Sequence, residues 1–423
     1  MKKSFNVCLQ SAARRRGAVA VFVALLMIPL LGFVALCVDI GWVTTTKSTL
    51  QNAADSAAAA GASQLVDYYG TYSTATTSAQ PSLISSAKSS ATTYGKKFCA
   101  YNGSGGVTSL NLLTNDVVFG FTDASNNFTS TYSGYPNTAK VTVRRDATAN
   151  GRLPFFFATA MGRHDTALAA TASMTIYTGL ITAFGPPSSV PGGVGAGSSD
   201  GAWGDGFWTD GADFDCDLLP VAFDVDHWNT FFASGMSPDG TIHTGTGGNK
   251  IIQIYPSPKQ SPGNFGLLNI GHWTNATPDF RNWVLDGPTV SDLQYLSTSG
   301  QFPVSLTAPK AWKGTPGLRT TLSNDFSAII GQPRLLPLFK PASTSPYQAA
   351  SGNGSNTTYS IVGFAGVTVT SVSGAGVNLS ICVQPCSVLD PTAVFDSTSI
   401  YPVGAQPAGQ LKTFTFLSPR LSR

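Results

Sequence analysis

A long segment without charged side chains constrains this chain more than any other feature of its sequence. Residues 17–38 are 22 consecutive uncharged residues, nearly all of them apolar. An α-helix rises about 1.5 Å per residue, so the segment is about 33 Å long as a helix and can cross a hydrocarbon layer about 30 Å thick. Pro29 and Gly32 lie inside it, and membrane helices tolerate such helix-weakening residues. The sequence therefore predicts a transmembrane helix that begins near Gly17 and is kinked near Pro29 and Gly32.

Two alternative interpretations of this segment fit the sequence less well. The apolar region of a cleaved secretory signal is normally about 7–15 residues long, shorter than residues 17–38, and no cleavage motif here precedes an obvious mature start. The core helix of a soluble domain rarely stays uncharged for this length directly behind three arginines, Arg14–Arg16. We therefore expect an uncleaved membrane anchor.

Basic residues determine the expected topology. Lys2, Lys3 and Arg14–Arg16 precede the segment, and no acidic residue lies among them. Basic residues beside a span remain on the cytoplasmic side. We therefore expect a single-pass inner-membrane protein with a cytoplasmic N-terminus and an exported C-terminal region, with Trp42 at the outer interface. For Asp39 we expect a solvated carboxylate at this interface; the alternative is a buried partner for another helix.

The helix is expected to continue beyond the membrane. Residues 47–65 are rich in Ala, which has the highest intrinsic helix propensity. Small residues recur at spacings of three and four in this stretch, namely Ala53, Ala57, Ala60 and Gly61. Such a face lets another helix approach closely. That second helix belongs either to the chain's own fold or to a neighbouring subunit, as in a homo-oligomer, and the sequence leaves both alternatives open.

The composition predicts that the rest of the chain is rich in strands. Charged residues make up 11% of the chain, against about 25% in ordinary soluble proteins. The 44 Gly and 26 Pro residues favour turns and strands over a helical bundle. Apart from the five basic residues that precede the span, the chain carries 20 basic and 22 acidic residues. This nearly neutral balance argues against a nucleic-acid-binding protein.

Hydrophobic periodicity gives a coarse map of the elements. It predicts strands over 117–121, 139–145, 167–177, 332–339, 359–370 and 377–383. It predicts short helices over 82–98, 154–161, 279–287 and 318–331. The expected fold class is therefore α+β, with one transmembrane helix that continues into an Ala-rich stalk and a mostly β exported region.

The N-terminal motifs resemble one known family. An Arg-rich start is followed by the uncharged span, then by Val38–Gly41, which reads VDIG, and by Leu50–Ala60, which reads LQNAADSAAAA. In this order and spacing, the motifs are similar to the N-terminus of the TadG-like (TadE/TadG) Flp pilus-assembly family. The resemblance extends over residues 14–180.

The resemblance implies a structural function rather than an enzymatic one. A TadG-like chain is expected to be a membrane-anchored assembly component of a Tad/Flp-type pilus or a related secretion apparatus. Its partners would be the inner membrane and other pilus-assembly or envelope proteins. Related TadE proteins and pilins carry Glu five residues after the Gly at which they are processed, whereas this chain has Phe22 five residues after Gly17. This difference favours the uncleaved TadG type.

Composition and resemblance together divide the chain into segments. We expect a basic cytoplasmic tail at 1–16, a transmembrane and stalk helix at 17–66, a pilin-like α+β region at 67–184, a Gly/Pro/Ser linker at 185–201 and a β-rich exported domain at 202–423.

A dense acidic segment contains a candidate metal site. The carboxylates of Asp213, Asp215 and Asp217 alternate along the chain and are of the type that binds Ca²⁺, although the Gly and Glu of an EF-hand loop are missing. The alternative is a polar loop without metal, and no other cofactor is expected. A Ca²⁺ site would favour a second hypothesis, a membrane-tethered surface adhesin or Ca²⁺-binding interaction module.

Cysteines and enzyme motifs add little chemistry. Cys382 and Cys386 are the nearest pair of exported cysteines and predict a disulfide that closes a small turn. Gly197–Gly201 matches the G-x-S-x-G motif but lacks the strand and helix that a hydrolase places around it. The four histidines show no zinc-ligand spacing. An anchored hydrolase is therefore the least favoured hypothesis, and we expect no enzymatic activity.

Overall fold

The computed structural model describes most of the chain and divides it into two compact units. It describes residues 8–185, 216–245, 248–255, 265–271, 276–317, 319–340, 357–374, 379–390, 392–417 and 420–421. The first unit comprises Met1–Ala60, Thr92–Val118 and Lys140–Ser173. The second unit comprises Gly61–Ala91, Phe119–Ala139 and Met174–Arg423. The units thus interleave along the sequence, unlike the linear segments expected at 67–184 and 202–423, and the expected linker at 185–201 lies, apart from Gly185, outside the described residues.

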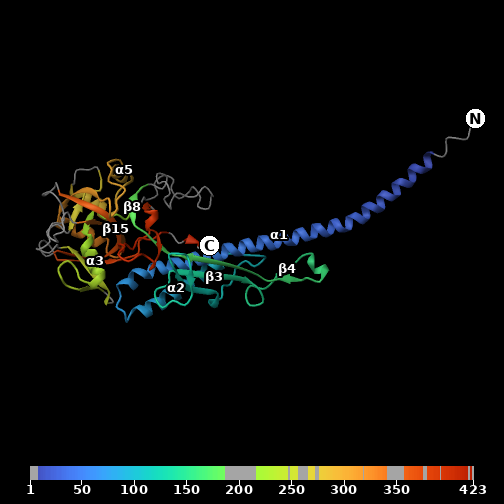
Figure 1. Cartoon of the computed structure of the whole chain (residues 1–423), viewed down its shortest axis with the longest axis horizontal. Helices are drawn as coiled ribbons and strands as arrows, with labels where there is room; N and C mark the ends of the chain where they lie inside the picture. Colours follow the sequence, from blue (N-terminus) through green and yellow to red (C-terminus); the bar gives the residue numbers. More distant parts are fainter. Residues whose placement is uncertain are drawn as a thin grey trace, which may run out of the picture. The chain divides into compact units, whose positions relative to one another are not determined.

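One helix dominates the first unit. Helix α1 runs from Cys8 to Thr74 without interruption, and Pro29 lies inside it. Figure 1 shows α1 as a continuous, gently curved helix. This confirms the prediction of a single apolar helix that continues into an Ala-rich second half, although α1 ends about nine residues later than expected. Helix α2 (Gln80–Ala100) corresponds to the helix predicted over 82–98.

A sheet of five strands has the order β19-β6-β3-β1-β2. Its strands are β1 (Val117–Thr122), β2 (Phe128–Thr129), β3 (Thr138–Arg145), β6 (Leu168–Thr175) and β19 (Arg420–Leu421). In β3, Val141 and Val143 are buried while Lys140, Thr142 and Arg144 are half-buried, as the alternation predicted. The structure therefore confirms the strands expected at 117–121, 139–145 and 167–177.

A hairpin in the first unit corrects one prediction. The residues expected to form a buried helix over 154–161 instead form strand β4 (Leu153–Pro154), a loop and the 3-10 helix η2 (Ala158–Met161). Strand β4 pairs with β5 (Asp165–Thr166), and η2 contains no buried residue. Because β4 takes up Pro154, only one helical turn remains, which is too short to bury an apolar face.

The second unit is built on a closed ring of strands. The sheet order is β10-β11-β16-β15-β13-β12-β9-β14, and β14 also pairs with β15. Strands β15, β13, β12, β9 and β14 therefore form a ring in which each pairs with two others, and β15 pairs in addition with β16 outside the ring. The pairings within the ring are antiparallel except for β9 with β14. Closure removes free strand edges within the ring. The strands are β9 (Val221–Asp224), β10 (His243–Thr244), β11 (Lys250–Tyr255), β12 (Phe265–Leu268), β13 (Lys310–Pro316), β14 (Pro333–Lys340), β15 (Thr357–Ser373) and β16 (Ser380–Pro385).

Short elements complete the second unit. The short helices are α3 (Val225–Ser234), α4 (Thr277–Leu285), α5 (Val290–Thr298), η5 (Thr320–Leu322), α6 (Ser323–Ala328) and η8 (Ser397–Ser399). Strand β7 (Tyr177–Thr178) pairs with β18 (Tyr401–Pro402), and β8 (Ile181–Phe184) pairs with β17 (Ala393–Phe395). The helix expected over 318–331 is shorter than predicted, because Ile330 forms a bridge with Val369 and Gly331 has a positive φ of 84°.

Aromatic side chains fill the core of the ring. Phe339 and Tyr359 are fully buried, and their ring centroids are 5.0 Å apart. The Tyr359 ring also lies against Gly266 on β12, where an added Cβ would be 1.9 Å from the Tyr359 hydroxyl. Any larger residue at position 266 would therefore clash with the Tyr359 side chain inside the ring of strands.

Candidate functional site

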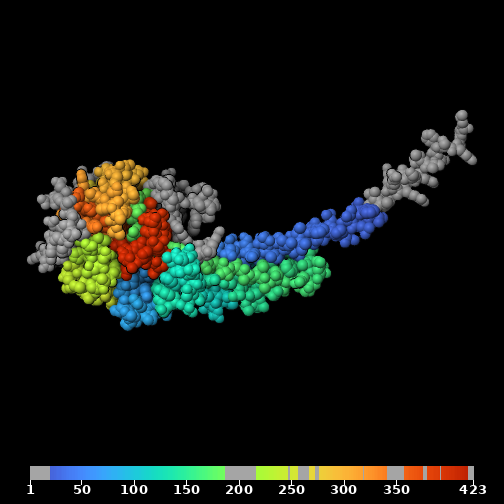
Figure 2. All heavy atoms as spheres, in the orientation of Figure 1, coloured from blue at the N-terminus to red at the C-terminus, as the bar shows by residue number. Residues whose placement is uncertain are grey.

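The N-terminal half of α1 has no packed face. Its large apolar side chains between Val21 and Ile40 are 44–72% exposed. Figure 2 shows this part of α1 as a rod that is uncovered toward its N-terminal end, while the hairpin that contains β4 lies along one side of the remainder. Phe22, Ile28 and Leu30 are all more than 60% exposed, although they point in widely separated directions around the helix axis. A helix of a soluble domain buries one apolar stripe. This helix buries none, and its apolar window has a mean hydropathy of 2.9, so it is a candidate membrane span by length and composition.

Asp39 lies at the end of this apolar stretch and is only 3% exposed. Its Oδ1 accepts hydrogen bonds from the backbone N–H groups of Phe156 (2.8 Å) and Phe157 (3.3 Å), and its Oδ2 accepts from those of Phe157 (3.1 Å) and Ala158 (2.7 Å). The prediction of a solvated carboxylate is therefore wrong. Its partner is also not a second long helix but the start of η2, whose first amides have no acceptor within a helical turn.

The hairpin formed by β4, η2 and β5 thus contacts α1 at a defined height. The rings of Trp42 and Phe156 have centroids 5.5 Å apart. A hollow of about 370 Å³ lies between the two elements beside this contact, and Leu36, Asp39 and Arg163 are among the residues that line it. The sequence offered one signal for this contact, an acidic residue directly after an uncharged span, but it could not indicate the amides that Asp39 binds.

The second half of α1 is buried by contrast. Ala53 and Ala57 have no exposed surface, and Ala60 is 8% exposed. On α2, an added Cβ at Gly95 would lie 3.2 Å from the Ala57 carbonyl oxygen. Within the second unit, an added Cβ at Gly61 would lie 3.4 Å from the Ala91 carbonyl oxygen. Of the two alternatives left open for these small residues, the structure supports packing within the chain's own fold.

A buried cation supports this packing, and no pattern in the sequence indicated it. Arg145 is 4% exposed and donates hydrogen bonds to the carbonyl oxygens of Ser104 (2.8 Å) and Gly105 (2.7 Å). Burial lowers the pKa of the Arg145 guanidinium. The Ser104 hydroxyl in turn donates to the Thr46 carbonyl oxygen at 2.8 Å, so the loop after α2 is fastened to α1.

The structure tests the candidate metal site only at one residue. Asp213 and Asp215 lie outside the described residues, and Asp217 forms an ion pair with Arg334 at 3.2 Å. Among the described residues there is no group of three or more side chains suited to holding a metal ion. The calcium site therefore stays a prediction, and Arg334 would compete with a cation for the Asp217 carboxylate.

The predicted disulfide is not formed. Cys382 and Cys386 are both free thiols. Cys382 lies within the extended strand β16, and Cys386 follows its end, so their Cα atoms are about 13 Å apart at about 3.3 Å per residue, whereas a disulfide requires less than about 7 Å. Burial raises the pKa of the Cys386 thiol to about 11.

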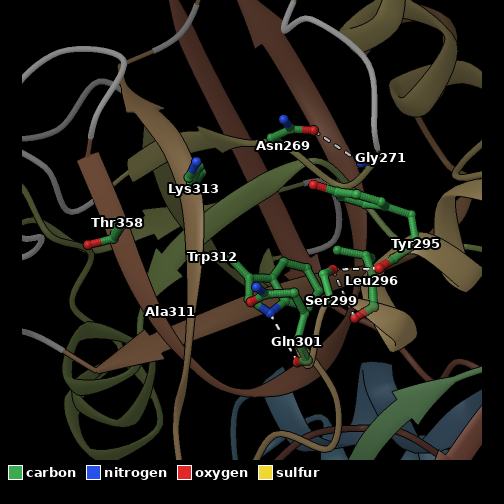
Figure 3. Close-up of a pocket in the computed structure, with 10 residues that line it drawn as sticks. All are labelled: Asn269, Gly271, Tyr295, Leu296, Ser299, Gln301, Ala311, Trp312, Lys313 and Thr358. Carbon is green, nitrogen blue, oxygen red and sulfur yellow. Dashed lines mark hydrogen bonds between the residues drawn. The ribbon is translucent and has the colours of Figure 1, made fainter.

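A hollow in the second unit offers no evident chemistry. Its volume is about 150 Å³. Figure 3 shows the residues that line it on β13 and α5. Two of its polar groups are already used: Trp312 Nε1 donates to the Gln301 carbonyl oxygen at 3.2 Å, and Asn269 Oδ1 accepts from the Gly271 amide at 3.1 Å. Lys313 is the one charged side chain among the residues drawn there.

Acidic residues near α3 also have structural partners. Asp224 forms the N-cap of α3 and accepts hydrogen bonds from the backbone N–H groups of Asp226 and His227. The Asp224 carboxylate is therefore engaged in holding the helix start.

Comparison with known proteins identifies the segment that contains the exposed helix. The family model described as putative Flp pilus-assembly TadE/G-like matches residues 17–64. Searches of the curated proteins and of the solved structures found no match. The match covers the exposed half of α1 and most of its buried half, and it confirms the resemblance over these residues. The resemblance expected over the rest of 14–180 stays a prediction. Residues 17–64 of this chain are therefore similar to the family described as putative Flp pilus-assembly TadE/G-like.

Proposed function

We propose that the chain is a membrane-anchored, non-enzymatic assembly component of a Tad/Flp-type pilus or of a related secretion apparatus. One observation carries this proposal: the TadE/G-like match falls on a helix whose apolar first half is exposed on all sides and whose second half is built into the fold. Such a helix ties a folded region to a membrane while leaving that region free to bind other proteins.

The proposed arrangement follows from charge and exposure. The basic N-terminus is cytoplasmic, residues 17–38 cross the inner membrane, and the region beyond Asp39 is exported. Since Ala53 and Ala57 are buried within the chain, contacts with other subunits use the lipid-exposed part of α1 or the surfaces of the exported region.

Gene deletion tests this function. We expect deletion to remove or shorten surface appendages seen by electron microscopy, and complementation with the unchanged gene to restore them. Complementation with the Leu30→Arg variant should fail, whereas the matched Leu30→Ile variant should succeed, because only the arginine places a charge in the span. Unchanged piliation in the deletion strain would contradict the assembly function and leave the surface adhesin as the leading hypothesis.

A further inference from the structure

The hairpin between β4 and β5 carries an apolar tip that its own unit leaves exposed. We define the hairpin tip as residues 155–163. Within it, Phe156 is 57% exposed, Phe157 is 50% exposed and Met161 is 86% exposed. Contiguous apolar side chains of this size on a surface indicate a contact with another apolar phase.

The contacts of the tip with α1 fix its height relative to the span. Asp39 binds the amides of Phe156, Phe157 and Ala158, and Trp42 packs on Phe156. Leu36, which belongs to the uncharged segment, lines the same hollow as Phe155 and Arg163. Figure 1 shows the hairpin of β4 lying beside α1, within the first unit. The tip is therefore level with the end of the span, where lipid head groups meet the acyl chains.

The composition and the backbone of the tip suit that position. Aromatic and other large apolar side chains next to a basic residue are typical of segments that lie in a membrane interface, and Arg163 directly follows Gly162 at the end of the tip. An unpaired amide is costly in an apolar phase. The Asp39 carboxylate satisfies three consecutive amides here, so the start of η2 does not depend on water for its hydrogen bonds.

We propose that the hairpin tip inserts into the lipid interface of the leaflet from which α1 emerges, so that the first unit contacts the bilayer at two places. The inference rests on the membrane anchor in the proposed function. Lipid is favoured over a protein partner because the exposed side chains of the tip continue the exposed apolar surface of α1 at the height of Leu36 and Ile40.

Site-specific photo-crosslinking of the full-length chain in its own membranes tests this proposal. A benzoyl-phenylalanine is placed, in separate variants, at Phe157 and at Met161. Phe33, which is 67% exposed inside the span, is the positive control. Tyr94 is the negative control, because it is an exposed aromatic residue beside Gly95, which contacts Ala57 about 27 Å along α1 from Asp39.

Mass spectrometry of the adducts gives the result. We expect lipid adducts from the probes at Phe157 and Met161 in yields comparable to those from the probe at Phe33. We expect no lipid adducts from the probe at Tyr94. Adducts to a protein instead of lipid would overturn the proposal in favour of a docking surface for a second chain. Lipid adducts from Phe33 without adducts from either tip position would also overturn it, since the anchor would then stand and the second contact would not. An absence of lipid adducts from Phe33 itself would contradict the anchor, and with it the proposal.

Discussion

The two halves of α1 within the first unit share one backbone and differ in what surrounds them. From Val21 to Ile40, bulky apolar side chains project in all directions and are exposed. From Leu50 to Ala60, small side chains predominate and most are buried against the chain's own fold. Since the helix continues through both halves, helix formation alone does not distinguish them.

The difference teaches that side-chain size separates a surface adapted to lipid from one adapted to protein. Large apolar groups gain little by packing on their own chain when acyl chains are available, whereas Ala and Gly allow backbones to come close. In the buried half, an added Cβ at Gly95 would approach the Ala57 carbonyl oxygen to 3.2 Å, a spacing that no larger residue would permit without a shift.

The largest effect is expected from a charge in the exposed half. Leu30→Arg should prevent stable insertion, because an arginine at the centre of a span costs about 2.5–3.5 kcal/mol on insertion scales. The measurement is the fraction of chain that remains in membranes after a carbonate wash, with Leu30→Ile as the control. Full recovery of the arginine variant in the membrane fraction would show that this half is not a span.

A smaller effect is expected from added volume in the buried half. Ala57→Leu should lower the free energy of unfolding by about 1–3 kcal/mol, because Ala57 has no exposed surface and its carbonyl oxygen faces α2 closely. The control is the same substitution in the other half, Ala24→Leu, where the side chain is exposed and no loss is expected.

Thermal unfolding and chemical crosslinking of both variants decide between the two roles of the small residues. Loss of stability with unchanged crosslinking supports packing within the chain. Unchanged stability together with fewer crosslinked higher-order species in Ala57→Leu would instead assign these residues to an interface between subunits.

At the boundary between the two halves, Asp39 holds the hairpin tip through hydrogen bonds to its backbone amides. Asp39→Ala should destabilise the hairpin tip by about 0.5–2 kcal/mol, the usual range for the loss of a helix cap. The measurement is hydrogen exchange at the amides of Phe156, Phe157 and Ala158, which should exchange faster. Asp39→Asn retains an acceptor oxygen and should have a smaller effect. Equal exchange in all three proteins would mean that the carboxylate does not hold these amides.

The smallest effect concerns reactivity rather than stability. Cys99 on α2 is fully buried, and burial raises its thiol pKa to about 11. Since the thiolate forms only as the pH rises toward that value, Cys99 should resist alkylation at pH 8 and react after unfolding. Cys37 lies inside the proposed span, so lipid should shield it from a water-soluble maleimide while the membrane is intact. Peptide-level mass spectrometry measures both, and rapid labelling of Cys99 at pH 8 would contradict its burial.

What the sequence could predict was local. An uncharged run fixes the length of the exposed half, and alternation identifies β3 with its buried Val141 and Val143. The prediction of a helix over 154–161 was wrong, because Pro154 pairs with β5 as part of strand β4 and leaves only one helical turn after it. The ring in the second unit closes because β14 pairs with both β15 and β9. The pairing with β9 joins residues more than 100 positions apart, such as Leu338 and Phe223, so no local pattern predicts it.

The contacts of Asp39 likewise could not be predicted from local sequence patterns. The carboxylate was visible in the sequence, but its amide partners follow 117–119 residues later. Nothing in the local pattern of either segment specifies that pairing. Likewise, the spacing of Ala53 and Ala57 predicted a close neighbour but could not say that α2 of the same chain supplies it.

The most direct test of the membrane anchor is the environment of α1 in a bilayer, measured with spin labels on the full-length chain. Labels at Phe22, Ile28 and Leu30 sample widely separated directions around the helix, and a label at Asn52 samples an exposed position of the second half. We predict high accessibility to oxygen and low accessibility to a water-soluble nickel complex at the first three positions, with the reverse at Asn52. High accessibility to the nickel complex at Phe22, Ile28 and Leu30 would contradict the membrane anchor.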